Sequence, residues 1–298
     1  MRPLLFNLDA DPDLGSRLCT ALDADHGELE QRHFPDGESY LRVHTAPAKR
    51  DCLILCNLYR PDNVTLRLLF LADTLRELGA NRVGLITPYL PYMRQDKRFH
   101  SGECVSSRPF ARLLSSSLDL LVTVDPHLHR YNSLDEIYSL KSAVVHAAPM
   151  IAQWISEQVE KPLLIGPDSE SEQWVSEVAK LADAPFQVLS KERRGDYDVS
   201  VSLPDVEKWR SHTPVLVDDI ISSGRTMLET LKHLQAAGLP RARVIAVHGL
   251  FAGDAWQQLE ALADVTTCES VPHPSNAIGL AKALAEATGT LLASDKGA

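Results

Sequence analysis

The sequence lacks the features that mark membrane-spanning, secreted and nucleic-acid-binding proteins. No stretch approaches the roughly 20 consecutive apolar residues that a membrane-spanning helix needs. An acidic residue stands as early as Asp9, which interrupts the apolar core that a signal peptide would require. Basic residues are outnumbered, 30 Lys and Arg against 40 Asp and Glu, so the formal net charge is −10. Because nucleic acid attracts basic surfaces, these absences predict a cytoplasmic protein that binds neither membranes nor nucleic acid.

Cysteine is scarce as well. The chain has five cysteines, an odd number, with no CxxC pair and no histidines at the spacing of a zinc site. This pattern excludes a disulfide framework and a structural zinc site as organising features. Cys52 and Cys56 lie four residues apart in an apparent strand, so they face the same side and are expected to pack as small hydrophobic residues.

The 298 residues suffice for two domains or one large domain, and 44% hydrophobic and 23% charged residues are typical of globular proteins. Short apolar runs alternate with amphipathic segments, which is the pattern of parallel strands joined by helices. The sequence therefore predicts an α/β fold with mostly parallel sheets. Strands are expected at 4–8, 52–58, 83–89, 118–125, 162–168, 215–220, 243–251 and 264–270. Helices are expected at 13–24, 63–78, 142–158, 170–182, 225–238 and 276–287.

Two segments resemble each other in the two halves of the chain. ELGANRVGLITP and AAGLPRARVIAVHG each read as the end of a helix, a glycine, a basic turn and a buried strand. Both an internal duplication and the ordinary likeness of α/β units explain this pattern. The spacing of the strands predicts one domain over residues 1–145 and a second over residues 146–298.

The segment VLVDDIISSGRTM, residues 215–227, carries the most chemical information. An apolar strand ends in Asp218 and Asp219, and a short polar turn leads into a helix. The N-terminus of a helix offers free N–H groups to a phosphate, and adjacent carboxylates suit ribose hydroxyls or a metal ion. The alternative is an ordinary connection capped by serine. The turn contains the hydroxyl and glycine residues Ser222, Ser223, Gly224 and Thr226.

A second segment, PYLPYMRQDKRFHSGE at residues 88–103, concentrates positive charge. Arg94, Lys97 and Arg98 place three cations within five residues. Arginine forms bidentate hydrogen bonds with phosphates and lysine acts as a point charge, so this density suits a polyphosphate. A solvated basic loop is the alternative.

These two segments resemble those of a known family. Residues 215–227 resemble the phosphoribosyl diphosphate loop shared by type I phosphoribosyltransferases and ribose-phosphate diphosphokinases. Residues 88–103 resemble the ATP-binding stretch of ribose-phosphate diphosphokinases, which the transferases lack. The resemblance implies a ribose 5-phosphate site formed by Asp218, Asp219, Ser222, Ser223, Gly224 and Thr226. It implies an ATP site that includes Arg94, Gln95, Asp96 and Arg98.

Four shorter matches follow the same family order. FPDGE at 34–38 resembles the adenine-contacting loop, in which Phe34 would stack on the base while Asp36 and Glu38 accept from its amino group. The resemblance places His127 of DPHLHR and Asp168 of GPDSE near Mg²⁺. Lys191 and Arg193 of SKERRGD match the catalytic Lys-x-Arg loop. His129 has no counterpart in the family and is expected to be structural.

The resemblance implies two tandem phosphoribosyltransferase-like domains with mostly parallel central sheets. It implies transfer of the diphosphoryl group of ATP to the C1 hydroxyl of ribose 5-phosphate, giving phosphoribosyl diphosphate and AMP. The implied cofactor is Mg²⁺, and the implied assembly is a homodimer or a larger assembly of dimers. The chain departs from the family pattern at Arg225, where a small residue is usual, and in the glycine-free segment SESEQWVSE after Asp168.

Two alternatives stay open at this point. A type I phosphoribosyltransferase would explain residues 215–227 but leaves residues 34–38 and 88–103 without a purpose. A catalytically inactive regulatory homologue would be expected to lack parts of the catalytic set. Lys191, Arg193, His127 and Asp168 are all present, so the active enzyme is the preferred interpretation.

Overall fold

A computed structural model describes residues 1–167, 171–193, 199–202 and 206–294 of the chain. The chain divides into two compact units. The first contains Met1–Val145 together with the residues from Ala281 onward, and the second contains His146–Leu280. Within the described ranges, no helix combines the length and the apolar character needed to cross a membrane.

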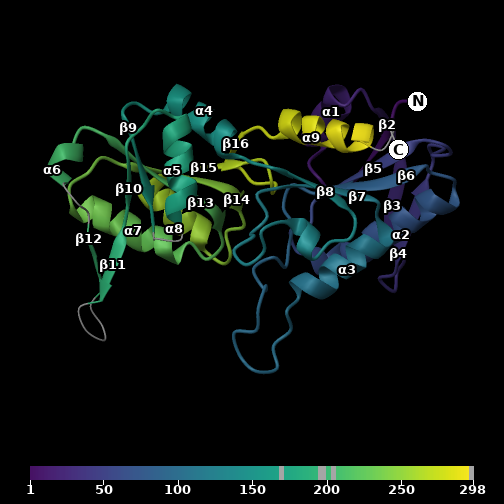
Figure 1. The fold of residues 1–298 in the computed structure, drawn as a ribbon, viewed down its shortest axis with the longest axis horizontal. Coiled ribbons are helices and arrows are strands. Elements are labelled where there is room, and N and C mark those ends of the chain that lie inside the picture. Colours follow the sequence, from purple (N-terminus) through teal and green to yellow (C-terminus); the bar gives the residue numbers. More distant parts are fainter. Residues whose placement is uncertain (168–170, 194–198, 203–205, 295–298) are drawn as a thin grey trace. The chain divides into compact units, whose positions relative to one another are not determined.

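The first unit is built on a six-stranded sheet in the order β2-β1-β5-β6-β7-β8 (Figure 1). Every neighbouring pair in this sheet is parallel. Its strands are β1 (Leu4–Leu8), β2 (Asp25–Gly27), β5 (Asp51–Cys56), β6 (Arg82–Ile86), β7 (Leu120–Val124) and β8 (Lys141–Val145). Its helices are α1 (Pro12–Ala21), α2 (Thr65–Glu77), α3 (Ser107–Ser117) and α9 (Ala281–Ser294), with short 3-10 turns η1 (Pro61–Asn63) and η2 (Leu134–Glu136).

The second unit repeats this plan. Its six-stranded sheet has the order β10-β9-β13-β14-β15-β16, and its neighbouring pairs are again parallel. The strands are β9 (Pro162–Gly166), β10 (Phe186–Val188), β13 (Thr213–Ile221), β14 (Ala242–Gly249), β15 (Ala263–Cys268) and β16 (Asn276–Ile278). The helices are α4 (Ala148–Gln158), α5 (Glu172–Leu181), α6 (Val206–Trp209), α7 (Arg225–Ala236) and α8 (Ala255–Leu262).

The two sheets also share an insertion. In the first unit an antiparallel hairpin, β3 (Leu29–His33) and β4 (Ser39–Val43), lies between the second and third strands of the sheet in chain order. In the second unit the antiparallel pair β11 (Ser190–Arg193) and β12 (Val199–Ser202) lies at the corresponding place. Equal strand order and an equal insertion point are what an internal duplication produces. The predicted α/β fold with two units and parallel sheets is confirmed.

Two predicted helices begin too early. Residues 142–158 contain β8 before α4 starts at Ala148, and residues 276–287 contain β16 before α9 starts at Ala281. Both strands occupy the edge of a sheet, where hydrogen bonding with β7 or β15, and not the local sequence pattern, determines the conformation. Helix α9 packs against α1, β7 and β8, and Arg82 donates to the Leu292 carbonyl at 3.1 Å. The C-terminal helix therefore belongs to the first unit, although residues 146–298 were expected to form one domain.

Each sheet supplies the apolar core of its unit. The central strands β5 and β7 are buried over almost their whole length, because helices cover both faces of a parallel sheet. Cys52 and Cys56 are fully buried in β5, as expected of small hydrophobic residues, and burial raises the pKa of the Cys52 thiol to about 12. Full burial of an aliphatic side chain in such a core contributes about 1.5–3 kcal/mol.

The cysteines yield a first prediction. Cys104 is exposed, whereas the other four cysteines are buried. Since the thiolate is the reactive form, burial protects the other four sterically, and it also raises the pKa of the Cys19, Cys52 and Cys56 thiols. A colorimetric thiol reagent should therefore modify one cysteine per chain rapidly in the native protein and all five after denaturation. Cys104→Ser should abolish the rapid phase, and a rapid phase that survives this substitution would contradict the assigned burial.

Candidate functional site

The loop from β13 to α7 forms the core of the site in the second unit. Helix α7 begins at Arg225, and Gly224 precedes it with φ of +66°, a left-handed backbone that favours glycine. Among the described residues no side chain caps this helix end. The N–H groups of the first turn have no acceptor within the helix, so they are available to an anion. Ser222 and Thr226 are partly buried beside this turn, and the side chain of Arg225 is exposed.

Asp218 and Asp219 lie near the carboxyl end of β13 and are partly buried. The Asp219 N–H donates to Asp218 Oδ1 at 3.0 Å, and the Ile220 N–H donates to Asp219 Oδ1 at 2.7 Å. These short-range hydrogen bonds fix the two carboxylates against the end of the strand. The pairing of β13 with β14 sets Asp218 opposite Ala246, so the carboxylates emerge at the edge where parallel strands collect ligands.

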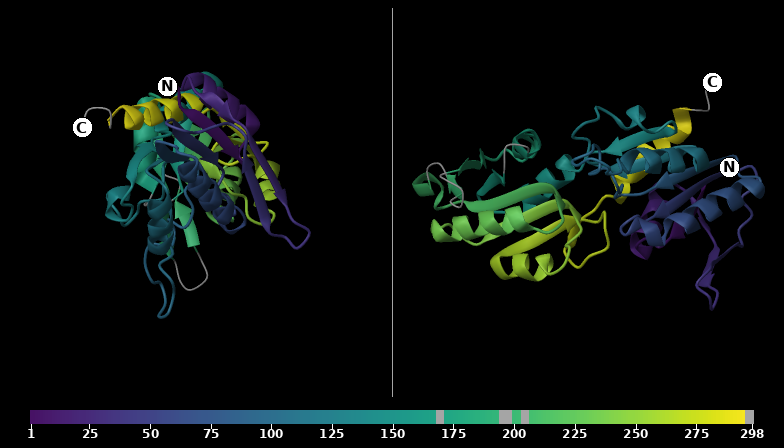
Figure 2. Two further views of the ribbon diagram at one scale, coloured as in Figure 1. Left: turned by 90° about the vertical axis from the view of Figure 1, so that its right-hand side faces the viewer. Right: turned by 90° about the horizontal axis from the view of Figure 1, so that it is seen from below.

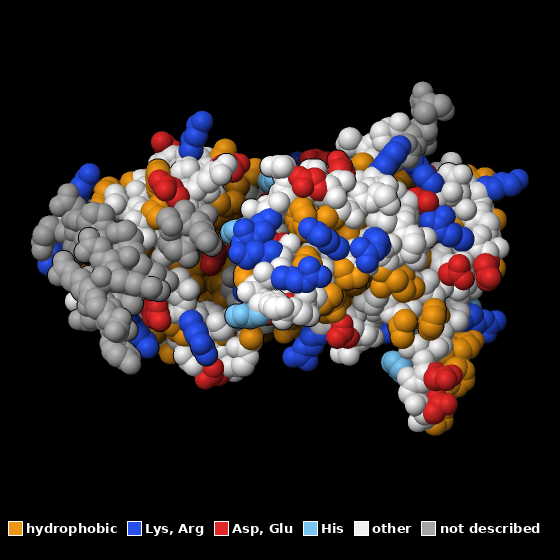
Figure 3. Space-filling model, turned by 60° about the horizontal axis from the view of Figure 1, so that its bottom comes forward, with side chains coloured by type: hydrophobic (Ala, Val, Ile, Leu, Met, Phe, Trp, Pro, Cys, Tyr) orange, Lys and Arg blue, Asp and Glu red, His pale blue; other side chains and the backbone are white. Residues whose placement is uncertain are grey.

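The basic segment of the first unit is a loop between β6 and α3. Arg94, Lys97 and Arg98 are all exposed. Basic side chains gather on this face of the first unit (Figure 3). Within the part of the chain that the structure describes, Arg94, Lys97 and Arg98 form no ion pair with a carboxylate. Arg98 Nε instead donates to the Glu103 carbonyl at 3.0 Å. The loop therefore presents positive charge to an anionic ligand.

The Glu103 carboxylate folds this loop back on itself. One oxygen, Oε2, accepts from the N–H groups of Phe99 and His100, each at 2.8 Å. Together with the hydrogen bond from Arg98 to the Glu103 carbonyl, these two bonds close residues 98–103 into a turn. This role of Glu103 could not be predicted from the sequence, because the same residues fit any exposed turn.

Asp96 has a different setting from its basic neighbours. It is only 7% exposed, and its Oδ1 accepts from Arg130 Nε at 3.3 Å. The Gln95 carbonyl accepts from the Ser107 hydroxyl at 3.1 Å, which ties the start of α3 to the same loop. Asp96 thus positions Arg130, a cation that the sequence pattern did not single out, beside the loop.

Tyr92 anchors the other end of the basic loop. Its backbone is left-handed, with φ of +63°, and its hydroxyl donates to the Asp62 carboxylate. Burial and this bond raise the pKa of Tyr92 to about 12, so the phenol stays a protonated donor. The Tyr92 and Phe110 rings lie 4.8 Å apart beside a cavity of about 330 Å³ between η1 and α3.

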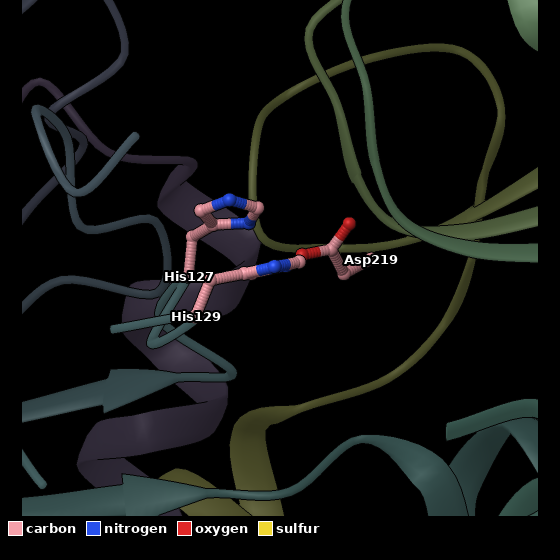
Figure 4. A group of neighbouring side chains, drawn as sticks. All are labelled: His127, His129 and Asp219. Carbon is pink, nitrogen blue, oxygen red and sulfur yellow. The ribbon is translucent and has the colours of Figure 1, made fainter. Parts of the chain in front are cut away.

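His127 follows β7 and stacks on His129, with ring centroids 3.9 Å apart and planes 26° apart (Figure 4). His127 is partly buried and His129 is exposed. The stack on His127 is the contact that the structure shows for His129, and the structural role of His129 stays a prediction. Figure 4 also draws Asp219, which belongs to β13 of the second unit.

FPDGE forms the turn of the β3–β4 hairpin, which projects from its sheet (Figure 2). The turn is closed by the Phe34 N–H to the Glu38 carbonyl at 2.8 Å and the Gly37 N–H to the Phe34 carbonyl at 2.9 Å. Phe34 is 39% exposed, and Gly37 has φ of +93°. The Arg32 guanidinium lies 4.7 Å from the Phe34 ring centroid, in a cation–π contact.

The predicted catalytic pair lies on a strand. Lys191 and Arg193 occupy alternate positions of β11, paired with Val201 and Val199 of β12. Asp168 lies outside the described residues. The structure thus groups Arg94, Gln95, Asp96 and Arg98 in one loop of the first unit. It groups the residues from Asp218 to Thr226 at one strand end of the second unit.

Comparison with known proteins agrees with this arrangement. The family model described as the N-terminal domain of ribose phosphate pyrophosphokinase matches residues 4–117, and the phosphoribosyl transferase domain matches residues 133–281. The fold and site thus define a two-domain protein of the phosphoribosyltransferase class. The N-terminal match separates it from the single-domain transferases.

Curated relatives are similar over nearly the whole chain. The ribose-phosphate pyrophosphokinase of Methanobrevibacter smithii is 32% identical, over 95% of this chain and 98% of its own length. That of Methanopyrus kandleri is 32% identical, over 93% and 96%. The crystal structure of phosphoribosylpyrophosphate synthetase from Mycobacterium smegmatis shares the fold, with a TM-score of 0.85 and 24% identity over 99% of this chain and 100% of that chain. The chain belongs to the ribose-phosphate pyrophosphokinase family, which confirms the resemblance and the predicted class of enzyme.

The Glu103 contacts generate a second prediction. Glu103→Ala removes the acceptor of two backbone N–H groups, each worth about 0.5–1.5 kcal/mol. Together they contribute about 1–3 kcal/mol, so local opening of the loop should increase by at least about fivefold. Limited trypsin digestion should then cleave after Lys97 or Arg98 faster by that factor. Glu77→Ala, on exposed α2 surface, is the control, and equal cleavage rates in the two variants would contradict the role of Glu103.

Proposed function

We propose that each unit of the chain holds one substrate of a diphosphoryl transfer, ATP in the first unit and ribose 5-phosphate in the second. The β,γ-diphosphoryl group of ATP moves onto the C1 hydroxyl of ribose 5-phosphate, and AMP and phosphoribosyl diphosphate are released. The observation that carries the proposal is the loop from Ser222 to Thr226, where two carboxylates precede an uncapped helix N-terminus.

In this proposal the loop and the first turn of α7 bind the 5-phosphate. The N–H groups of the turn and the hydroxyls of Ser222, Ser223 and Thr226 donate to the phosphate oxygens. Asp218 and Asp219 accept from the ribose hydroxyls, which they face from the end of β13. Arg225 is compatible with this site because its exposed side chain leaves the backbone donors accessible.

The ATP site in this proposal is the basic loop of the first unit together with the hairpin. Arg94, Gln95 and Arg98 contact the nucleotide from the loop, and Asp96 acts through Arg130. Phe34 stacks on the adenine ring, and Asp36 and Glu38 accept from its amino group. The exposure of Phe34 and its contact with Arg32 support this role.

Lys191 and Arg193 carry the catalytic role in this proposal. The C1 hydroxyl attacks the β-phosphorus in line, and the developing negative charge on the phosphoryl oxygens is the main obstacle. Cations that contact those oxygens only in the transition state raise turnover rather than ground-state affinity. Two cationic residues at alternate positions of a strand are suited to such a contact.

We propose Mg²⁺ as the cofactor, with His127 and Asp168 near it. Mg²⁺ prefers oxygen ligands and retains several waters, so His127 would act through a coordinated water rather than directly. The stack with His129 fixes the imidazole plane for such a contact. When bound, Mg²⁺ supplies charge neutralisation between the phosphates.

We also propose a homodimer or an assembly of dimers, and a cytoplasmic location. Leu66 and Phe70, one helical turn apart on α2, are 61% and 50% exposed. Helix α2 contacts β4, so this apolar face adjoins the projecting hairpin. A second copy that covers Leu66 and Phe70 would remove this apolar surface from water.

AMP release tests the proposed function. The full chain with ATP and Mg²⁺ should release AMP only when ribose 5-phosphate is present, and phosphoribosyl diphosphate should appear in equal amount. Tight ATP binding without AMP release would favour an inactive regulatory protein. Release of pyrophosphate from phosphoribosyl diphosphate, dependent on an added base, would instead favour a phosphoribosyltransferase.

Lys191→Ala should lower kcat by about a hundredfold to a thousandfold, because loss of one transition-state contact to the charged oxygens costs about 3–4 kcal/mol. The affinity for ribose 5-phosphate should change little. Steady-state kinetics with both substrates, together with calorimetric titration, separates the two effects. Lys180→Ala, on the exposed surface of α5, is the matched control. Near-normal turnover of the Lys191 variant would remove this residue from the catalytic role.

A further inference from the structure

The loop that follows β13 is held in place by a segment distant in sequence. The N–H groups of Leu250 and Phe251 donate to the Ile221 carbonyl at 2.9 and 3.1 Å, and the Ala252 N–H donates to the Ser222 carbonyl at 2.9 Å. These three bonds attach residues 250–252, just after β14, to the start of the loop that leads into α7. The position of the loop therefore depends on the position of this segment.

The segment adopts a backbone that its central residue does not favour. Phe251 has φ of +43°, in the left-handed region that is costly for a bulky residue. Such a conformation persists only where surrounding contacts determine it. Phe251 is 9% exposed, so its ring is the obvious source of those contacts.

Three neighbours enclose the Phe251 ring. Gly249 makes room for it, since a Cβ there would lie 2.5 Å from Phe251 Cε2. The Trp256 ring lies 5.3 Å away at 68°, and the His273 ring lies 4.5 Å away at 41°. Trp256 and His273 contact each other at 4.5 Å, so the three rings form one cluster.

Hydrogen bonds hold the His273 ring in turn. Ser275 donates its N–H to His273 Nδ1 at 3.2 Å, and the Ser275 hydroxyl bonds the Thr267 hydroxyl of β15 at 2.8 Å. Trp256 is on α8, and the same helix packs against Gly224 in the loop between β13 and α7. A Cβ at Gly224 would meet Leu259 Cδ1 at 3.2 Å and Ala255 Cβ at 3.6 Å.

We infer that Phe251, enclosed by Trp256 and His273, is a positioning residue for ribose 5-phosphate: its ring fixes the backbone that aims the Ser222–Thr226 loop at the phosphate. This inference rests on the proposed function, because it takes ribose 5-phosphate as the ligand of the loop. Phe251 touches no substrate in this account. It acts through the carbonyls of Ile221 and Ser222.

Calorimetric titration of the full chain with ribose 5-phosphate, without ATP, tests the inference. Phe251→Ala should weaken binding about tenfold, roughly the effect of losing one hydrogen bond to the charged phosphate. Phe251→Gly should weaken binding equally, because the ring is lost while the left-handed backbone becomes easy. Binding by Phe251→Gly as tight as in the unchanged chain would overturn the role of the ring.

A matched control separates positioning from stability. Trp209→Ala removes another nearly buried aromatic ring from the core of the second unit. It should leave ribose 5-phosphate affinity within about twofold, because the hydrogen bonds to the Ile221 and Ser222 carbonyls come from residues 250–252 and not from α6. In steady-state kinetics, Phe251→Ala should raise KM for ribose 5-phosphate about tenfold with a smaller change in kcat. A fall in kcat at unchanged KM, which partial unfolding would produce, counts against the inference.

Milder variants decide the question if Phe251→Ala does not fold. His273→Ala removes one ring of the cluster and should weaken ribose 5-phosphate binding about threefold. His273→Phe supplies another ring and should restore the affinity, because aromatic packing rather than the imidazole holds Phe251. Equal affinity in all three chains overturns the inference.

Asp218→Ala distinguishes failure of the inference from failure of the proposed function. If the unchanged chain binds ribose 5-phosphate and Asp218→Ala weakens binding while Phe251→Ala does not, the positioning role alone is overturned. If the unchanged chain does not bind ribose 5-phosphate, the proposed function fails and the positioning role fails with it.

Discussion

The hydrogen bonding of parallel strands is the constraint on which the rest of the molecule depends. When every neighbouring pair in a sheet is parallel, all strands end at one edge, and the chain must return through a helix before the next strand begins. The N-termini of those helices meet that same edge. In the second unit this places the carboxylates of β13 and the free N–H groups of α7 within one short loop. A phosphate-binding geometry thus follows from the sheet before any specialised side chain is considered.

Positive charge is concentrated in short segments rather than spread over the whole surface. A net charge of −10 coexists with clustered cations because the basic residues occupy short segments, Arg94 to Arg98 in the first unit and Lys191 with Arg193 in the second. At about 0.15 M salt, screening acts over about 8 Å, so distant acidic residues do little to weaken these local fields. Glu103 and Asp96 lie next to the basic loop, yet each is engaged in organising it. These two acids therefore organise the basic loop, and Asp96 also forms an ion pair with Arg130.

Much of the fold could be predicted from sequence because its signals are local. The strand Leu4–Leu8 and the start of α7 at Arg225 follow from apolar runs and from a glycine with its polar neighbours. The features that escaped prediction depend on partners far along the chain. β8 was assigned to a helix because its pairing with β7 is invisible in the pattern, and the docking of α9 on the first unit is a tertiary contact. At the candidate site, the types of the binding residues could be predicted from the sequence. The contacts made by Glu103, Arg130 and the His129 ring are visible only in the structure.

The matching insertions between the second and third strands show how one architecture supports two different tasks. In one unit the hairpin presents an aromatic ring and carboxylates, and in the other it carries a lysine and an arginine. Each hairpin leaves the sheet after an edge strand and returns before an interior one. Its sequence can therefore change without disturbing the register of the ladder beneath it. The same arrangement of six strands can therefore carry hairpins that differ in their chemistry.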